Sequence, residues 1–291
     1  MSIEVTGLNY YPVKSCAGIS AQELDVTETG FLYDREWMVV DGEGTFMSQR
    51  QNPEMVLIRP EIEVGWLKFE APGMEDLAVP VYPPDNENLE TKVHKASVGA
   101  ISYGKDASDW LSEYLKTEAR LVKTNPDQPR EIIERYQREG ASNCVGFADG
   151  FAFLLASEVS LEELNAHLPE PVPMNRFRPN IVIKGEDLEA YEEDYWPEVR
   201  IGNMWSFVVR ASARCPIPDT DQSTGIRPED RPVTAALRAT RHGLDTTNLN
   251  QGRGNFFGQN LNHVFQEGIT IKVGDEVEPL GVTTKRNITL I

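Results

Sequence analysis

Short segments in which apolar and polar residues alternate dominate the beginning of the chain. Residues 3–8 (IEVTGL) alternate like a half-buried strand, and residues 33–40 (YDREWMVV) form a second segment rich in aromatic and β-branched residues. Residues 41–44 (DGEG) are typical of a hairpin turn, which predicts a returning strand over residues 46–50. Similar segments continue to Tyr82. The pattern predicts an all-β unit, a barrel or a sandwich, over roughly the first hundred residues.

A helical period replaces this alternation at residues 106–123. Asp106 can cap the helix, and apolar side chains recur on one face, including Trp110 and Leu115. The segment 125–129 (NPDQP) then interrupts the chain with prolines, so we predict a domain boundary there. The predicted domains are residues 1–124 and residues 125–291.

The second half of the chain shows further strand patterns and one more helix signal. Ser160 and Glu163 have the spacing of a capping box. The helix that it opens carries Leu161, Leu164 and Leu168 on one side. Strands are predicted over residues 151–156, 181–183, 199–210 with a hairpin turn at 202–203, 269–275 and 277–280. The fold class that follows is mixed and β-rich (α+β), with two packed β parts and a few helices.

The stretch at residues 210–225 (RASARCPIPDTDQSTG) combines a strand end, a loop and a reactive side chain. Cys215 lies where the strand runs out into a loop, the place where a rigid scaffold presents functional groups. Arg214 beside it favours the thiolate, the form of cysteine that binds metals or attacks electrophiles. The alternative is a cysteine buried at a strand end, because free cysteine is among the most buried residue types.

Composition narrows the class of protein. The formal net charge of −18 argues against nucleic acid or an anionic membrane as a partner. The three cysteines are too scattered for a disulfide framework, and no CxxC pair is present. Neither a secretory signal nor an apolar run long enough for a membrane span is visible. We therefore predict a cytoplasmic protein without a membrane span.

Basic residues beside loop residues suggest an anion pocket. Lys14, Arg35 and Arg214 each stand next to turn or loop residues, and Arg176 and Arg178 lie just before the strand at 181–183. Each alone is expected to be a surface charge. Together they could line a phosphate site, because arginine side chains bind phosphate in a fork geometry. No phosphate-binding GxxxxGK[ST] loop, HExxH motif or GxSxG elbow is present in the sequence.

Six sequence blocks resemble one known family. They follow one another in the family's order, and together they span nearly the whole chain, so the resemblance is specific. The blocks are residues 11–18 (YPVKSCAG), 34–40 (DREWMVV), 50–58 (RQNPEMVLI), 176–183 (RFRPNIVI), 214–215 (RC) and 257–259 (FGQ). The chain resembles MOSC proteins that carry an N-terminal β-barrel domain, and within them the mitochondrial amidoxime reducing component and its bacterial counterparts. The resemblance implies an N-terminal β-barrel-like domain packed on a MOSC β-barrel domain.

The resemblance also implies a molybdenum cofactor, a pterin whose dithiolene holds the metal and whose phosphate is held by basic residues. The family's protein ligand to molybdenum, and its catalytic centre, falls on Cys215, and a soft thiolate suits that metal. The cofactor contacts carry over to Lys14, Ser15, Arg35, Asp149, Gly150, Phe151, Arg178, Asn180, Arg214 and Asn260. Ala213 stands where the most similar relatives often have serine, and Pro216 and Pro218 also depart from them, which puts the substrate in doubt.

The activity that the resemblance implies is two-electron reduction of small N-hydroxylated, amidoxime-like substrates. Neither the membrane anchor of the mitochondrial members nor the ferredoxin domain of some bacterial ones is expected in this sequence. Electrons are therefore expected from a separate carrier, either a cytochrome b5-like protein or a flavin or iron–sulfur reductase.

Two alternatives stay open at this stage. MOSC domains also occur in molybdenum-cofactor sulfurases, so the chain could instead bind the cofactor or carry sulfur on Cys215. The other alternative is a binding module that keeps only the barrel.

Overall fold

The computed structural model describes residues 2–83, 88–93, 96–245, 253–283 and 288–290. Within these residues the protein is β-rich and has three α-helices, which confirms the predicted fold class. The helices are α1 (Gly104–Leu115), α2 (Glu158–Asn165) and α3 (Pro232–Thr240). In the part of the chain that the structure describes, none of the helices has the length and apolar character needed to cross a membrane.

A closed barrel forms the larger part of the molecule. Its strands follow the spatial order β14-β15-β1-β21-β16-β17-β19, and β19 pairs back with β14 to complete the ring. Apart from the parallel pair β14–β15, the neighbours in the ring are antiparallel. The bounds are β1 (Ile3–Tyr10), β14 (Phe153–Ser157), β15 (Ile181–Gly185), β16 (Glu198–Ile201), β17 (Met204–Ala213), β19 (Arg253–His263) and β21 (Glu276–Pro279). Side chains such as Phe153, Trp196 and Leu261 fill the core of this part.

Gly258 lets the barrel close at the β14–β19 seam. Its φ of +78° is a left-handed conformation that glycine adopts without strain. A Cβ at this position would lie 2.7 Å from the carbonyl oxygen of Leu155 on the neighbouring strand. The glycine of the 257–259 block is therefore explained by close backbone approach.

Short strands extend and flank the barrel. β2 (Ile19–Ala21) pairs with β1, and β18 (His242–Asp245) joins β19 to β22 (Ile288–Leu290). A separate sheet has the order β20-β3-β4, and a last pair is β12-β13. The bounds of these strands are β3 (Glu23–Thr27), β4 (Gly30–Phe31), β12 (Arg130–Glu131), β13 (Cys144–Val145) and β20 (Thr270–Lys272).

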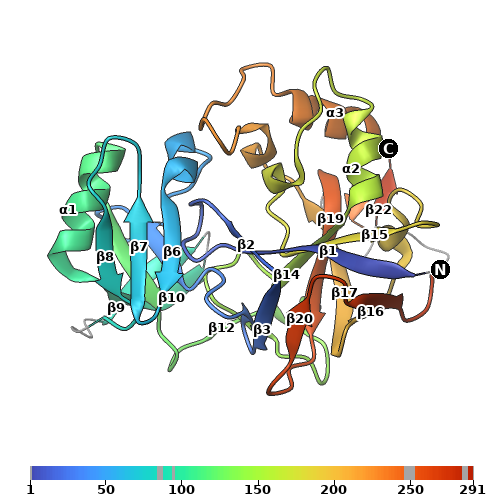
Figure 1. The fold of residues 1–291 in the computed structure, drawn as a ribbon, viewed down its shortest axis with the longest axis horizontal. Helices are drawn as coiled ribbons and strands as arrows, with labels where there is room; N and C mark the ends of the chain where they lie inside the picture. Colours follow the sequence, from blue (N-terminus) through green and yellow to red (C-terminus); the bar gives the residue numbers. More distant parts are fainter. Residues whose placement is uncertain (1, 84–87, 94–95, 246–252, 284–287, 291) are drawn as a thin grey trace.

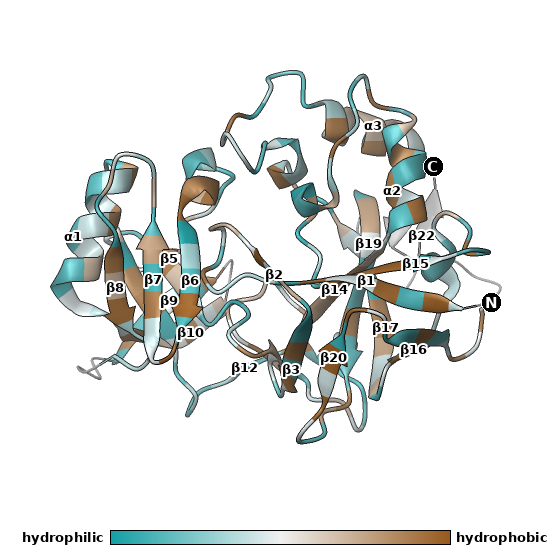
Figure 2. Ribbon diagram, viewed as in Figure 1, coloured by the Kyte–Doolittle hydropathy of each residue, from teal (hydrophilic) through white to brown (hydrophobic). Residues whose placement is uncertain are grey.

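The first half of the chain folds into a second β unit, at the left of Figure 1 with α1 on its outside. One sheet has the order β5-β11-β10-β9 and the other β6-β7-β8. Their bounds are β5 (Trp37–Val40), β6 (Arg59–Glu63), β7 (Trp66–Glu70), β8 (Leu77–Pro80), β9 (Asn88–Val93), β10 (Ala96–Ser102) and β11 (Arg120–Thr124). Trp37, Leu67 and Leu111 pack in a core distinct from that of the barrel. Figure 2 shows the apolar positions concentrated on the strands of both parts. The domain boundary after residue 124 stays a prediction. β1 precedes this boundary in the sequence, but it pairs within the barrel.

The structure corrects the predicted helix at residues 106–123. α1 ends at Leu115, because Lys116 adopts a left-handed conformation with φ of 56°, and residues 120–124 form β11 instead. Pairing with β5 and β10 outweighs helical continuation for this β-branched segment. Asp106 is not the cap, since the N-cap position is Tyr103 and Asp106 lies inside the first turn.

Two other local predictions are also wrong. The cap of α2 is Ser157, whose Oγ accepts a hydrogen bond from the Ser160 amide, so the helix begins one turn earlier than the predicted capping box. Residues 46–50 make only an isolated bridge at Phe46 instead of a strand. The chain turns there because the Asn52 amide donates to the carbonyl of Ser48 at 2.9 Å. That turn carries Arg50 to the junction between the two parts.

Candidate functional site

A cavity of about 350 Å³ lies at the junction of the two parts. Loops of the first part line one side of it, and β14, β17 and β19 of the barrel line the other. All eleven residues predicted as cofactor or metal contacts line this cavity: Lys14, Ser15, Arg35, Asp149, Gly150, Phe151, Arg178, Asn180, Arg214, Cys215 and Asn260. Their proximity is a structural fact, and their roles toward a cofactor stay predictions. Arg176, the other cation considered for the anion pocket, is not among the lining residues and pairs with Asp221.

Cys215 is placed just beyond the end of β17, at the start of a proline-containing loop. It is partly exposed to the cavity, so the alternative of a fully buried strand-end cysteine does not hold. Cys16 provides the contrast: it is fully buried, and burial raises its thiol pKa to about 12. Cys215 is thus the thiol that this cavity presents to a ligand.

Two guanidinium groups lie near Cys215. Arg214 donates to Ser212 Oγ at 3.0 Å and to the Phe177 carbonyl at 2.7 Å. Burial lowers the pKa of Arg214, and the nearby Cys215 opposes this change. Burial also lowers the pKa of Arg50, but Cys215 and the Asp149 carboxylate together raise it, so that the pKa is raised overall. Arg50 is therefore a cation that lines the cavity close to the thiol.

Lys14 reaches the cavity from the loop after β1. Its Nζ donates to the Phe147 carbonyl at 2.8 Å and to Asp149 Oδ1 at 2.5 Å. Burial lowers the pKa of Lys14, and the Asp149 carboxylate opposes this. The Asp149 side chain is 62% exposed and also lies 3.8 Å from Arg50 Nη2. One solvent-facing carboxylate therefore connects two of the cations.

Arg35 and Arg178 both lie against the ring of Tyr11. Their guanidinium carbons are 4.6 and 4.2 Å from the ring centre. Burial lowers the pKa of Arg178 to about 10, and the like charge of Arg35 acts in the same direction. Tyr11 is fixed by its hydroxyl, which donates to the Pro179 carbonyl at 3.0 Å. Arg178 is buried and Arg35, which pairs with Asp34, is partly buried, so two cations stand against one ring at the cavity wall.

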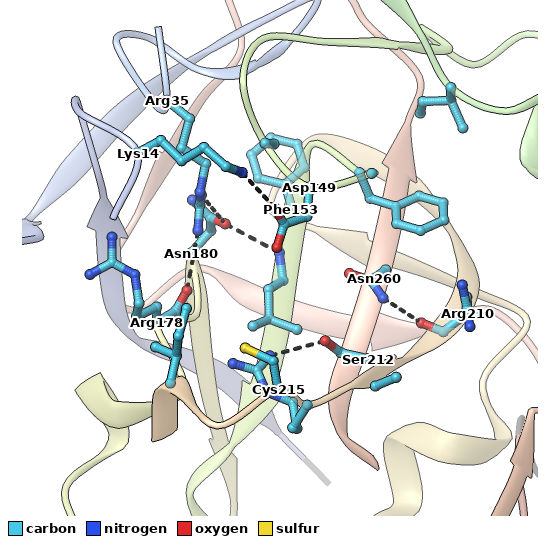
Figure 3. A pocket seen from close by; sticks show the side chains of 18 of the residues that line it. Lys14, Arg35, Asp149, Phe153, Arg178, Asn180, Arg210, Ser212, Cys215 and Asn260 are labelled. Atoms are coloured by element: carbon cyan, nitrogen blue, oxygen red, sulfur yellow. Dashed lines mark hydrogen bonds and ion pairs between the residues drawn. The ribbon is translucent and has the colours of Figure 1, made fainter. Parts of the chain in front are cut away.

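Asn180 and Asp34 hold Arg35 in place. Arg35 forms an ion pair with Asp34, and its Nη1 also donates to Asn180 Oδ1 at 3.0 Å. Asn180 is 1% exposed and donates through Nδ2 to Asp34 Oδ2 at 3.0 Å. Figure 3 shows Arg35 and Asn180 on the same side of the cavity as Lys14 and Arg178.

The backbone at the cavity is strained at three positions. Ser15, Arg35 and Arg178 have φ angles of 70°, 54° and 56°, a left-handed region that non-glycine residues seldom occupy. Residues held this way cost free energy and cluster at ligand sites, where the surrounding structure enforces them. Each of the three brings its side chain or backbone to the cavity wall.

Several lining residues with charged or aromatic side chains were not selected from the sequence, among them Phe46, Arg50, Arg130, Tyr136 and Arg210. Arg50 opens the 50–58 block, and Arg210 opens the 210–225 stretch, so both stood next to recognised signals. Arg210 precedes Ser212 by two positions on β17, and strand alternation could have placed both on one face. Tyr136 lies in the polar segment 131–146, which carries no such signal.

The remaining predicted residues lie on the barrel side of the cavity. Phe151 packs edge-on against Tyr136, with ring centres 5.4 Å apart. Asn260 Nδ2 donates to the Arg210 carbonyl at 3.1 Å, which joins β19 to β17. No group of three His, Cys, Asp or Glu side chains is placed to hold a metal ion among the residues described.

Comparisons with known proteins agree on one family. The profile of the MOSC N-terminal beta barrel domain matches residues 2–118, and that of the MOSC domain matches residues 143–278. The mitochondrial amidoxime-reducing component 1 of Mus musculus is 36% identical over 284 residues, covering 95% of this chain and 82% of its own. The Homo sapiens protein of the same name is 33% identical, covering 95% and 83%.

A protein of another kind is also similar. The molybdenum cofactor sulfurase of Bos taurus is 31% identical over 246 residues, which cover 78% of this chain but only 28% of the sulfurase. The family therefore indicates a function associated with the molybdenum cofactor. The chain belongs to the MOSC-domain family and joins a MOSC N-terminal β-barrel domain to a MOSC domain.

Proposed function

We propose that this protein is a molybdenum-cofactor-dependent reductase of N-hydroxylated, amidoxime-like compounds. One observation carries the proposal: the cavity that presents Cys215 is strongly cationic in an acidic protein. Seven of its lining residues are Lys or Arg and two are Asp or Glu, whereas the whole chain has a net charge of −18. A thiolate ligand and a phosphate-binding wall within one cavity match the two ends of a metal-carrying pterin phosphate.

The residues present fit such a group. Lys14, Arg35 and Arg178 would hold the phosphate, and Cys215 would bind the metal. Arg214 Nε is buried without a hydrogen-bond partner among the described residues, so the wall retains a donor for a ligand. When bound, the cofactor supplies the two-electron reduction of the N–O bond.

The chain's own residues position and shield the reaction. Arg50 places positive charge beside Cys215 on the cavity wall and would attract the anionic groups of a bound cofactor. Phe46, Phe151 and Phe153 line the cavity with apolar surface and limit the access of water. Asn180 and Asp34 keep Arg35 from adopting other positions.

The test is cofactor content and turnover of the full chain, purified from a host that makes the cofactor. We expect about one molybdenum and one pterin per chain, and reduction of benzamidoxime with a chemically reduced viologen dye. We expect no turnover with NADH alone, because the sequence has no flavin, nicotinamide or iron–sulfur motif, and a separate carrier is part of the proposal. That carrier is a cytochrome b5-like protein or a flavin or iron–sulfur reductase. Protein that binds no molybdenum or pterin under these conditions would refute the proposal.

A second candidate function is cofactor binding or sulfur transfer by Cys215. The similarity to the bovine molybdenum cofactor sulfurase supports it, together with the partial exposure of the thiol. Mass spectrometry after treatment with a sulfur donor distinguishes the two candidates. A stable persulfide on Cys215, with bound cofactor but no amidoxime reduction, would favour the carrier. A cytoplasmic location is also part of our proposal and is testable by cell fractionation.

A further inference from the structure

The corner of the cavity around Tyr136 contains a buried polar atom that the protein does not use. Tyr136 ends the short 3-10 helix Glu134–Tyr136, is 3% exposed and lines the cavity. Its hydroxyl has no hydrogen-bond partner among the residues that the structure describes. Leaving a buried hydroxyl unpaired is energetically unfavourable, so such an atom points to a ligand.

Positive charge surrounds this hydroxyl-bearing ring. The guanidinium carbon of Arg210 lies 5.4 Å from the ring centre of Tyr136, and that of Arg135 lies 4.9 Å away. Arg210 and Arg130 line the same cavity as the ring, and the two acidic residues of the lining, Glu131 and Asp149, are both exposed to solvent. The chemistry of the corner therefore favours an acceptor that carries negative charge.

An apolar surface lies next to this charge. The Phe151 ring packs edge-on against Tyr136 with an interplanar angle of 67°, and Ile132 and Ile133 complete the lining. Ile133 lines the cavity and is 63% exposed, so it leaves an apolar contact surface there. A ligand that joins an aromatic ring to a carboxylate matches both features.

The corner is separate from the wall assigned to the cofactor phosphate. In Figure 3, Arg210 and Asn260 lie on one side of the cavity, and Lys14, Arg35 and Arg178 lie on the other. Arg210 belongs to β17, which leads directly to Cys215. A substrate held at the corner can therefore extend toward the thiol without displacing a group bound at the opposite wall.

We propose that Tyr136 and Arg210 form a specificity subsite for a carboxylate on an aromatic N-hydroxylated substrate. The proposal rests on the proposed function and deepens it by naming the substrate class. The Tyr136 hydroxyl donates to the carboxylate, Arg210 supplies the opposite charge, and Phe151 contacts the ring. A site built to hydrogen-bond a substrate group discriminates strongly against the analogue that lacks it.

The test compares two probes on the cofactor-loaded protein: 4-carboxybenzamidoxime and unsubstituted benzamidoxime. Tyr136→Phe and Arg210→Gln should each raise the KM of the carboxylated probe by about tenfold, because each removes a contact to a charged group. We expect kcat for both probes, and KM for benzamidoxime, to change less than twofold. Arg210→Glu should reverse the preference toward 4-aminomethylbenzamidoxime. If the variants raised KM by the same factor for benzamidoxime and for 4-carboxybenzamidoxime, the proposed subsite would be wrong.

Matched controls and a binding measurement separate this inference from the proposed function. Arg200→Gln removes an arginine paired with Glu278 away from the cavity, and Tyr10→Phe removes a hydroxyl that does not line it. With either control variant, KM and kcat for both probes should match those of the wild-type protein. Calorimetric binding of 4-carboxybenzamidoxime should weaken about tenfold in Tyr136→Phe and Arg210→Gln. If binding weakens but no reduction occurs, the subsite stands and the proposed function fails. If reduction occurs and neither variant weakens binding, the subsite is wrong and the function stands.

Discussion

The cavity around Cys215 and a polar cluster beside α2 both bury charge in the barrel, but they are built differently. The α2 cluster comprises Ser157, Ser160, Glu193, Asp194, Arg241 and Gln259, all buried. In it, Arg241 Nη2 lies 2.7 Å from Asp194 Oδ2, and Gln259 Nε2 donates to Asp194 Oδ1 at 2.7 Å. Ser160 Oγ donates to Glu193 Oε1 at 2.9 Å. Acids and their partners are matched inside the protein.

The cavity keeps an excess of one sign of charge instead. Its lining residues carry more cations than acids, and none of the α2 cluster lies in that lining. Buried charge therefore does not by itself identify a ligand site. What distinguishes the site is an excess of cations next to open volume. In the α2 cluster, which has two acids and one cation, hydrogen bonds and an ion pair inside the protein satisfy the carboxylates instead.

The largest expected effect is the loss of activity when Cys215 changes to serine. Serine has nearly the same volume, but it is a harder ligand that suits a reduced molybdenum centre poorly. We expect reductase activity to fall about 1000-fold, or about 4 kcal/mol, with an unfolding free energy within about 1 kcal/mol of wild type. Steady-state rates and urea unfolding measure the two effects. Cys144→Ser is the control and should keep full activity, whereas an active Cys215→Ser protein would refute the metal-ligand role.

Arg241→Met should show the opposite pattern in the α2 cluster. Methionine fills similar space but leaves Asp194 buried without its cation, which costs about 3 to 4 kcal/mol of unfolding free energy. The protein that remains folded should keep its molybdenum content, because Arg241 does not line the cavity. Arg200→Met, which removes one half of an exposed pair with Glu278, should cost less than about 1 kcal/mol in the same urea titration. If both variants lowered the unfolding free energy by a similar amount, the buried pair would not differ in stability from the exposed one.

The sequence predicted more of the site than of its surroundings. Strand patterns located β1, β15 and the β16–β17 hairpin, since alternation and turn chemistry are local signals. The strand pattern that predicted β17 also placed Cys215 just beyond the end of that strand. Tyr136 was missed because long-range folding, not local pattern, brings it to the cavity, whereas Arg50 and Arg210 stood beside recognised signals and were overlooked.

The wrong local predictions have a common cause. The segment 120–124 continued an acceptable helical period, but pairing with β5 and β10 decided its conformation. The capping box at Ser160 was a plausible signal, yet Ser160 is buried and bonded to Glu193, while Ser157 caps the helix. Tertiary contacts that the sequence does not display outweighed local propensity in both cases.

Arg178→Glu tests the cationic wall of the cavity. The change removes a charge-assisted contact and adds repulsion toward a phosphate, so cofactor binding should weaken by about 3 kcal/mol, roughly 100-fold. Pterin and molybdenum content of the purified variant measure the loss. Lys184→Glu is the matched control, because Lys184 lies exposed on the adjoining strand β15 and pairs with Glu158. Normal pterin content in a folded Arg178→Glu protein would show that this wall does not hold the cofactor.

The smallest expected effect is a pH-dependent gain in stability from Glu193→Gln. Burial raises the pKa of Glu193 to about 7, with the neighbouring Asp194 carboxylate acting in the same direction. The usual pKa of this carboxyl is 4.5, so between this value and about 7 the folded protein keeps a proton that the unfolded chain has lost. The stability that comes with the neutral carboxyl is fully present below pH 4.5. It is lost as the pH rises through about 7, where the buried side chain becomes charged.

Glutamine remains neutral and keeps an acceptor for Ser160, so Glu193→Gln should exceed wild type by about 2 kcal/mol of unfolding free energy at pH 8. The difference should vanish at pH 4. Urea unfolding at both pH values provides the measurement, and Glu192→Gln, one residue away and partly exposed, should change the free energy by less than about 0.5 kcal/mol. Reductase activity should be unchanged in both variants, since neither residue lines the cavity. A Glu193→Gln protein with the same advantage at pH 4 and pH 8 would show that the gain comes from packing and not from the buried carboxylate.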